Sequence, residues 1–465
     1  MARILSALLL SVLCAINGCT SAQVTQTQAP QPNASQAEGK KQEQSQEARS
    51  PEERLRKEKP QEERAAEEQP RHEERDEEDT VLSAIAAAPE YLVEGLAYPF
   101  KKFAIFYERT DLMNRLMDLF YNDERTGGVF PRMAVGGALS SGIGFTAFHQ
   151  DLFHQKKEVR ARYLYATRGN QTADFAYRDP SLFGSKFMLD LDVFWLNFDN
   201  GFFFPGGNRA AENGKTKYDL NQLSQNARLS YMVAPNLKAS LLGRILFADA
   251  GPSSRTPTTP PTVPGIDTYM QGVAAEPSLT YDSRDNPFRP STGLYIDTGF
   301  TYTNQLNGDQ FRYMGYWVDV QRYIPVFRGN RVLVIRAYLS KLDSLDGKSI
   351  PFYELNLLDL NNGLRGFDRG RWQDKGALLF NLEWRYPVWK DVEGTIFLDQ
   401  GQVFGDYKDL QPKLFQYSAG GGFRFVTSRN FAFRVQLAAS NDGWLALFRS
   451  DLEFVRHRGT VLGGF

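Results

Sequence analysis

The sequence has almost no cysteine or histidine, and this scarcity removes several kinds of site. Both of its 2 Cys, Cys14 and Cys19, lie near the start of the chain, so the rest of the chain has no thiol for a disulfide or a metal site. The 4 His show neither metal-ligand spacing nor a Ser-His-Asp arrangement. We therefore expect no metal, no other cofactor, no catalytic residues and no enzyme activity.

A surplus of positive charge and long apolar runs are also missing. The formal net charge is -1, so the chain lacks the basic surplus with which proteins bind nucleic-acid phosphates. The mean hydropathy of -0.43 is too polar for a bundle of membrane-spanning helices. The only long apolar run, residues 4–18, is too short for such a helix and is typical of a secretory signal.

The end of this signal allows two processing sites. The stretch "AINGC" places the small Gly18 before Cys19 and resembles the lipobox at which bacterial lipoproteins are lipidated and cut. We expect a lipoprotein-type signal peptide over residues 1–18 and lipidation at Cys19. Cleavage after Ala22, without lipidation, is the alternative.

Two segments with different patterns follow the signal. Residues 19–79 are rich in Gln, Glu, Arg, Lys and Pro and cannot bury enough apolar surface to offset the entropy of ordering, which predicts a disordered, charged linker. In residues 80–127, apolar residues such as Leu112, Leu116 and Leu119 recur at helical spacing, which predicts an amphipathic helical segment. Its apolar face would lie on the membrane or on the domain that follows; a small independent helical domain is the alternative.

From residue 128 onward, apolar residues alternate with polar ones. In "LFNLEWRYPV" one face carries Leu382, Trp384 and Tyr386, and the other carries Asn381, Glu383 and Arg385. The stretches "KFMLDLDVFWLNF" and "FAFRVQLA" repeat this alternation. An aromatic, apolar face opposite a charged one is typical of outer-membrane strands, whose outer side meets lipid and whose inner side meets a wet lumen. A soluble sandwich also alternates, but its second face would not need so many charges.

The alternating segments number about sixteen, an even number as outer-membrane barrels require. The longer connections, near 199–216, 250–271 and 343–375, follow odd-numbered segments, whereas short turns such as "APN" and "KDVEG" follow even-numbered ones. The expected strands start near residues 130, 142, 159, 171, 186, 217, 237, 272, 291, 311, 331, 376, 393, 415, 430 and 444.

We therefore predict an all-β protein whose residues 128–465 form a sixteen-stranded antiparallel transmembrane β-barrel. Such barrels lie in the outer membrane of Gram-negative bacteria and keep short turns in the periplasm, so the N-terminus is expected to be periplasmic. The expected surroundings are outer-membrane lipid, and the expected oligomeric state is a monomeric barrel.

One connection contains a motif that an ordinary loop would not need. In "NGLRGFDRGRW", the residues Leu364, Arg365, Gly366 and Phe367 fall between the eleventh and twelfth expected strands. They resemble a motif of the bacterial surface antigen superfamily, which contains the central barrel-assembly insertase, the translocation-and-assembly barrel and the two-partner secretion transporters. In that superfamily the sixth extracellular loop folds back into the lumen.

The resemblance implies partners for the arginine on the inner faces of the next two strands, namely Glu383, Phe397 and Asp399. Physical chemistry agrees, because the planar fork of Arg365 can meet a carboxylate with two bonds and Gly366 lets the backbone approach the wall. Phe367 would supply an apolar contact. In a wet lumen such an ion pair contributes about 1 kcal/mol or less, unless the loop shields it from water.

A second match is "YDSRDNPFRPSTG", between the eighth and ninth expected strands. It resembles a periplasmic turn of the same superfamily, with the matching residues Asp282, Arg284, Asp285, Asn286, Pro287 and Gly293. Turn chemistry alone explains much of this stretch, but it does not require Arg284, for which we expect a structural ion pair. The stretch "GGGFRF" at 420–425 adds to the resemblance.

The chain also departs from the superfamily. Residues 19–127 leave no room for the polypeptide-transport-associated (POTRA) domains that usually precede such a barrel, so the transport role is not carried over whole. The residues after Phe454 extend beyond the expected last strand as a tail. Gly136 and Gly137 would weaken the first strand at the seam with the last one, or would relieve crowding where the barrel closes.

Two functions of different classes follow. The first is insertion, assembly or translocation of protein or lipid at the outer membrane, with envelope polypeptides as substrates or a periplasmic protein as partner. The second is a structural or interaction lipoprotein whose barrel anchors a partner-binding tether or loops. A passive porin explains neither the "RGF" nor the "DNP" motif.

Overall fold

The computed structural model describes residues 119–124, 126–134, 142–211, 214–254, 263–287, 289–326, 331–359, 363–389, 392–426 and 432–449. The predictions for the signal peptide, Cys19, the linker, the paired glycines of the first strand and the tail lie outside these ranges. Of the helical segment predicted over 80–127, the first described residues, Leu119 and Phe120, are helical. No helix in the described ranges is long and apolar enough to cross a membrane.

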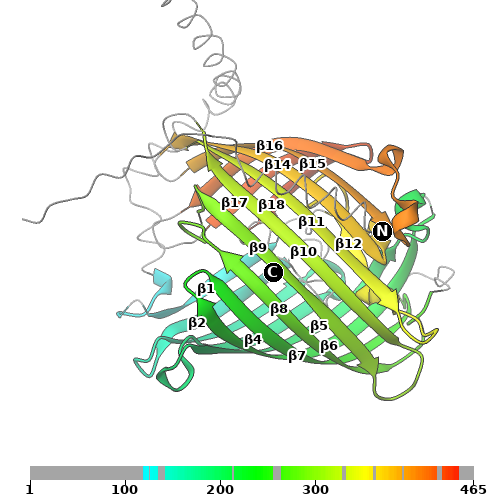
Figure 1. Cartoon of the computed structure of the whole chain (residues 1–465), viewed down its shortest axis with the longest axis horizontal. Coiled ribbons are helices and arrows are strands. Elements are labelled where there is room, and N and C mark those ends of the chain that lie inside the picture. The colour runs from blue at the N-terminus through cyan, green and yellow to red at the C-terminus, as the bar shows by residue number, and fades with distance from the viewer. Residues whose placement is uncertain are drawn as a thin grey trace, which may run out of the picture. The chain divides into compact units, whose positions relative to one another are not determined.

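The predicted sixteen-stranded antiparallel barrel is confirmed, and Figure 1 shows its tilted strands side by side. Every strand starts within three residues of its expected position. The strands are β1 (Gly127–Ala134), β2 (Gly142–Leu152), β3 (Lys157–Ala166), β4 (Gln171–Asp179), β5 (Phe187–Phe203), β6 (Thr216–Ala234), β7 (Leu237–Pro252), β8 (Met270–Asp282), β9 (Gly293–Gln305), β10 (Arg312–Pro325), β11 (Val332–Ser344), β14 (Gly376–Trp389), β15 (Val392–Phe404), β16 (Gln416–Val426), β17 (Ala432–Ser440) and β18 (Gly443–Arg449).

Two short strands, β12 (Asn356–Leu358) and β13 (Trp372–Asp374), pair with each other outside this sheet. The described 3-10 turns are η1 (Thr167–Gly169), η2 (Leu182–Gly184), η3 (Gly207–Arg209), η5 (Phe352–Glu354), η6 (Tyr407–Asp409) and η7 (Pro412–Leu414).

The period of two in the sequence separates the two faces of the wall. On β14, Leu382 is 44% exposed, whereas the adjacent Glu383 is 0% exposed. The pairing partners of Leu382, Ile335 on β11 and Leu398 on β15, are 43% and 48% exposed. An apolar outer face of this kind is stabilised by lipid, and it leaves the charged side chains to the lumen.

The connections differ between the two ends of the barrel, as the sequence predicts. At the short-turn end, β6 and β7 are joined by residues 235–236 alone. At the long-loop end, residues 204–215, 253–269 and 345–375 connect β5 to β6, β7 to β8 and β11 to β14. The last of these, which we call the lumen loop, contains η5, β12 and β13.

The lumen loop packs on the inner face of the wall. Its residues Leu364 and Phe367 are both 0% exposed and contact the inward side chains of β14 and β15. The cluster that they form consists of Leu358, Leu364, Phe367, Trp372, Ala377, Leu379 and Val403. This packing places the "LRGF" motif inside the barrel, against the C-terminal part of the wall.

Candidate functional site

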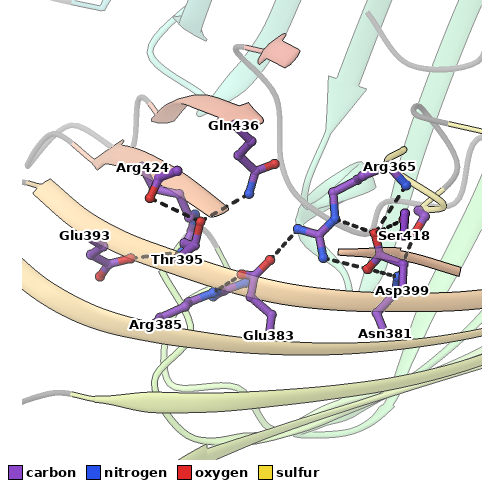
Figure 2. Close-up of polar contacts among 12 residues, drawn as sticks. Arg365, Asn381, Glu383, Arg385, Glu393, Thr395, Asp399, Ser418, Arg424 and Gln436 are labelled. Carbon is purple, nitrogen blue, oxygen red and sulfur yellow. Dashed lines mark hydrogen bonds and ion pairs between the residues drawn. The ribbon is translucent and has the colours of Figure 1, made fainter. Parts of the chain in front are cut away.

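Arg365 lies between two carboxylates of the wall (Figure 2). Its Nη1 donates to Oε2 of Glu383 at 2.6 Å, and its Nε and Nη2 donate to the two oxygens of Asp399 at 2.9 and 2.7 Å. The backbone N–H of Arg365 also donates to Asp399, at 3.2 Å. One guanidinium therefore binds both carboxylates, and it binds Asp399 in bidentate geometry. We call these three residues the arginine cluster.

The pairing of β14 with β15 sets the separation of the two carboxylates. Asp399 lies opposite Asn381, and Glu383 lies two residues further along β14, opposite Phe397. Diagonal neighbours of this kind are about 7–8 Å apart on one face of a sheet. This gap accommodates a planar guanidinium with one carboxylate on each side.

Neighbouring polar groups complete the arginine cluster. Arg385 Nε donates to the second oxygen of Glu383 at 2.6 Å, and Asn381 Nδ2 and Ser418 Oγ donate to Asp399 at 2.7 and 3.3 Å. Figure 2 shows these side chains converging on the two carboxylates. Two arginines and two carboxylates balance in charge, so the group avoids the cost of an uncompensated buried ion.

Burial changes the energy expected of this ion pair. The side chain of Arg365 is 3% exposed, and those of Glu383 and Asp399 are 0% exposed. A solvated pair would contribute about 1 kcal/mol or less, but the lumen loop keeps water away from this one. Removing one partner of a buried, hydrogen-bonded pair costs about 3–5 kcal/mol, because the other charge stays buried without compensation.

The arginine cluster also has an aromatic floor. The guanidinium of Arg365 lies 3.5 Å from the ring centroid of Phe397 on β15. A Cβ at Gly420 on β16 would lie 2.5 Å from this ring, so the glycine makes room for it. The glycines in "GGGFRF" therefore have a local packing role beside the cluster.

Gly366 brings the loop backbone into contact with the wall. A Cβ on this residue would lie 2.6 Å from Cβ of Ser418 and 2.8 Å from Cβ of Ser440. The Ser440 hydroxyl donates to the carbonyl oxygen of Gly366 at 2.6 Å. Only a residue without a side chain lets this contact form.

We predict that Gly366→Ala lifts residues 364–367 from the wall and raises the ion conductance of the barrel in planar bilayers several-fold. Gly214→Ala is the matched control, because the nearest atom to a Cβ at Gly214, its chain neighbours aside, is Cβ of Ala211 at 3.9 Å, an ordinary van der Waals contact. Replacing Ser418 and Ser440 by glycine in the Gly366→Ala chain should restore the closed state. The Ser418→Gly, Ser440→Gly chain with Gly366 retained is the control for loss of the two serine hydrogen bonds, and a rescue absent although that control stays closed would contradict steric exclusion by the two serine side chains.

The lumen loop contacts other loops at the long-loop end. Arg371 Nε donates to Asp442 between β17 and β18 at 2.6 Å, and its Nη1 donates to the carbonyl oxygen of Ala210 at 2.8 Å. Asn208 of η3 accepts a hydrogen bond from the backbone N–H of Val403 on β15, at 3.3 Å. The loop between β5 and β6 therefore reaches β15, far from its own strands.

Arg369 is a buried cation of the lumen loop. Arg369 is 8% exposed, and neither its Nη1 nor its Nη2 makes a hydrogen bond to the described residues. Its guanidinium lies 5.4 Å from the ring centroid of Phe198, and burial lowers the pKa of Arg369 to about 10, although Asp359 acts in the opposite direction. Burial of Arg369 therefore disfavours the docked loop, and the favourable contacts offset this cost.

Sequence comparison decides the family. The Omp85 superfamily domain matches residues 155–443, which is most of the barrel. The chain belongs to the Omp85 superfamily. The resemblance that the sequence motifs indicated is thereby confirmed, and so is a barrel of the Gram-negative outer membrane. A search of curated proteins finds no match.

One solved structure with a TM-score above 0.5 agrees with this fold, and two others are similar at lower scores. BamA from Haemophilus ducreyi lacking POTRA domains 1-3 is similar over 70% of this chain and 69% of that chain, with 15% identity and a TM-score of 0.52. CdiB from Acinetobacter baumannii, at 12% identity, has a TM-score of 0.46 over 69% of this chain and 58% of its own. CdiB from Escherichia coli, at 11% identity, has a TM-score of 0.48 over 70% of this chain and 60% of its own. Similarity to BamA at this level of identity concerns the barrel fold alone.

The second motif of this Omp85 barrel lies in the turn between β8 and β9, at the short-turn end. Arg284 donates through Nε and Nη2 to the two oxygens of Asp282, both at 2.8 Å, which is the ion pair expected from the sequence. Asp285 accepts the backbone N–H groups of Ser291 and Thr292 at 2.9 and 3.2 Å. These contacts stay within the turn.

The other motif residues shape the turn backbone. Asn286 accepts the N–H of Arg289 at 3.1 Å, Pro287 follows it in the turn, and Gly293 has φ 114°, a left-handed conformation that favours glycine. Arg289 then reaches Glu393 on β15, at 2.5 Å. The sequence analysis missed this longer contact, because nothing in the turn motif points to a partner on another hairpin.

The site offers no place for a metal in the described ranges, where no three His, Cys, Asp or Glu side chains are grouped to hold one ion. The arrangement can hold the loop in place through packing and through ion pairs. A loop with an arginine, a glycine and a phenylalanine is docked on the inner wall of an Omp85 barrel by buried, charge-balanced contacts.

Proposed function

We propose that this Omp85 barrel inserts, assembles or translocates a polypeptide or lipid at the outer membrane, and that the lumen loop is its lid. The observation that carries the proposal is the arginine cluster, in which a loop arginine is 3% exposed between two wall carboxylates that are 0% exposed. The buried ion pairs hold the loop in the lumen against the cost of their desolvation, which is what a lid requires.

We further propose that the long-loop end faces the cell exterior and that the N-terminus lies in the periplasm. Short turns in the periplasm and long loops outside are the rule for such barrels, and this chain has the matching asymmetry. Substrate would then arrive from the same side as the predicted linker, residues 19–79. Lipidation of Cys19 would hold that linker at the membrane.

The proposal is tested with the full-length protein in liposomes and a urea-unfolded, eight-stranded outer-membrane barrel as the probe. We expect the probe to fold several-fold faster than in liposomes that contain a porin of similar size. Folding is followed by the loss of protease sensitivity and by the shift of the folded band on unheated gels. Equal rates in both kinds of liposome would contradict an assembly role.

Deletion of residues 20–80 separates this proposal from the interaction hypothesis. If the barrel anchors a partner-binding tether, the truncated protein loses a co-purified envelope protein while its gel mobility and conductance stay the same. If the barrel is itself the assembly component, the truncated protein still accelerates folding of the probe.

A further inference from the structure

The lumen loop is also held at a second place. Glu354, in η5, accepts hydrogen bonds from Nη2 and Nη1 of Arg244 at 2.7 and 3.2 Å and from the hydroxyl of Tyr313 at 2.9 Å. Arg244 belongs to β7 and Tyr313 to β10, whereas the arginine cluster uses β14 and β15. In the sheet, β8 to β11 lie between β7 and β14, so the two attachments are on different parts of the wall.

The second attachment has the same two components as the first. Its charged side chains are buried, with Arg244 6% and Glu354 4% exposed. Phe352, two residues before Glu354, is 1% exposed and packs edge-to-face on Phe203 and Tyr218, with centroids 5.4 and 4.8 Å apart. An ion pair next to a buried phenyl ring is also what Arg365 and Phe367 provide at the arginine cluster.

The sense of the charges is reversed between the two attachments. At the arginine cluster the loop supplies the cation and the wall supplies the carboxylates, whereas at Glu354 the loop supplies the carboxylate and the wall supplies the cation. Each ion pair forms only when the loop is docked on the wall. Undocking would leave Arg385 as the remaining cation beside Glu383 and Asp399 and would take Glu354 away from Arg244, so both pairs favour the docked state.

We propose that Glu354, Arg244 and Tyr313 are a second positioning site of the lumen loop, and that the lid opens only when both sites have been released. This inference rests on the proposed lid. Only residues 355–364 separate the two sites along the loop. While one site is still bound, the remainder of the loop stays tethered within the lumen and continues to obstruct it.

The test compares open probability in planar bilayers for the full chain and three variants, Glu354→Gln, Arg365→Ala and the two combined. If both sites hold the lid, Glu354→Gln raises the open probability by roughly tenfold or more and multiplies the effect of Arg365→Ala by a similar factor. Asp190→Asn is the matched control, because Asp190 pairs with Arg178 on the neighbouring strand instead of with the loop.

The outcomes distinguish the second site from the lid itself. If Arg365→Ala opens the barrel while Glu354→Gln has no effect in either background, the lid stands and the second site is overturned. If even the combined variant stays closed, the lid fails and the second site fails with it. A Glu354 effect as small as that of Asp190→Asn also overturns the inference.

Two further variants separate positioning from a general loss of folding. Exchanging the charges, with Glu354→Arg and Arg244→Glu in one chain, should bring the open probability back toward that of the unmodified protein. Tyr313→Phe removes one hydrogen bond but little volume, and should raise the open probability by a smaller factor than Glu354→Gln. If the exchange restores the folded band on unheated gels but not the closed state, the ion pair is not what positions the loop.

Discussion

Arg365→Ala is expected to raise the open probability of the barrel, so that large, fluctuating conductance steps become more frequent. The substitution leaves Glu383 and Asp399 buried without their shared cation, and loss of one partner of a buried pair costs about 3–5 kcal/mol. Because about 1.4 kcal/mol corresponds to a factor of ten, the population with an undocked loop should rise about 100-fold or more. Planar-bilayer recording of the refolded protein measures this directly.

The matched control for this experiment is another arginine of the inner wall. Arg178 pairs with Asp190 at 2.6 Å, but its side chain is 58% exposed, and an exposed pair contributes about 1 kcal/mol or less. Arg178→Ala should therefore leave the conductance unchanged. Equal conductance of the Arg365→Ala, Arg178→Ala and unmodified proteins would show that Arg365 does not hold the loop, and a closed Glu354→Gln, Arg365→Ala double variant would rule out the lumen loop as a lid.

A lysine at the same position is a finer test of the geometry. Arg365→Lys keeps the positive charge but replaces the planar fork with a single ammonium group, which cannot bind Asp399 in bidentate geometry while also reaching Glu383. Its conductance should fall between that of the unmodified protein and that of Arg365→Ala. A value equal to that of the unmodified protein would mean that charge alone, without the fork, holds the loop.

Phe367→Ala should release the same loop with the arginine still present. Phe367 is 0% exposed and packs edge-to-face on Trp372, with ring centroids 5.6 Å apart. Truncating a buried phenylalanine to alanine costs about 3–5 kcal/mol, because it leaves a cavity as well as losing apolar burial. The docked state then loses about as much free energy as it loses with Arg365.

Limited proteolysis in liposomes measures this release independently of conductance. The lumen loop contains Arg365, Arg369 and Arg371, which are 3%, 8% and 6% exposed, so trypsin should not cut the docked loop after these residues, whereas the more accessible Lys348 and Lys375 can be cut in either state. In Phe367→Ala, we expect mass spectrometry to detect cleavage after these arginines. Phe300→Ala is the matched control, because Phe300 on β9 is 58% exposed on the apolar outer face. Equal resistance of the two variants would show that Phe367 does not hold the loop.

The strands and the arginine cluster could be predicted because both depend on local periodicity. A period of two places Glu383 and Asp399 on the inner face as soon as the strands are recognised, and the resemblance supplied the matching arginine. Two features are known only from the structure. One is the diagonal register of β14 and β15, and the other is the burial that makes the ion pair contribute more to docking than a solvated pair would.

The contacts of Glu354 and Asn208 could not be predicted in this way. Glu354 lies 110 residues from Arg244, and Asn208 lies 195 residues from Val403, with no repeated spacing to relate them. In the sequence, Arg244 alternates with apolar neighbours as any lumen charge would. Which lumen charge meets which loop depends on how the loop folds across the sheet, and neither pattern nor turn chemistry determines that path.

The positions of the loop's partners along the chain impose an order on assembly. Arg244 and Tyr313 precede the lumen loop, whereas Glu383, Asp399 and Ser440 follow it. The attachment at Glu354 can form once β7 and β10 are in the sheet, but Arg365 has no partners before β14 and β15 pair, and Gly366 has none on β17 until later still. Docking of Arg365 therefore requires β14 and β15 to be in the sheet, and docking of Gly366 requires β17 as well. A fully docked loop therefore indicates that the wall is complete through β17. In a barrel that lacks these strands, the loop cannot dock at Arg365 and Gly366, and only the attachment at Glu354 can hold it.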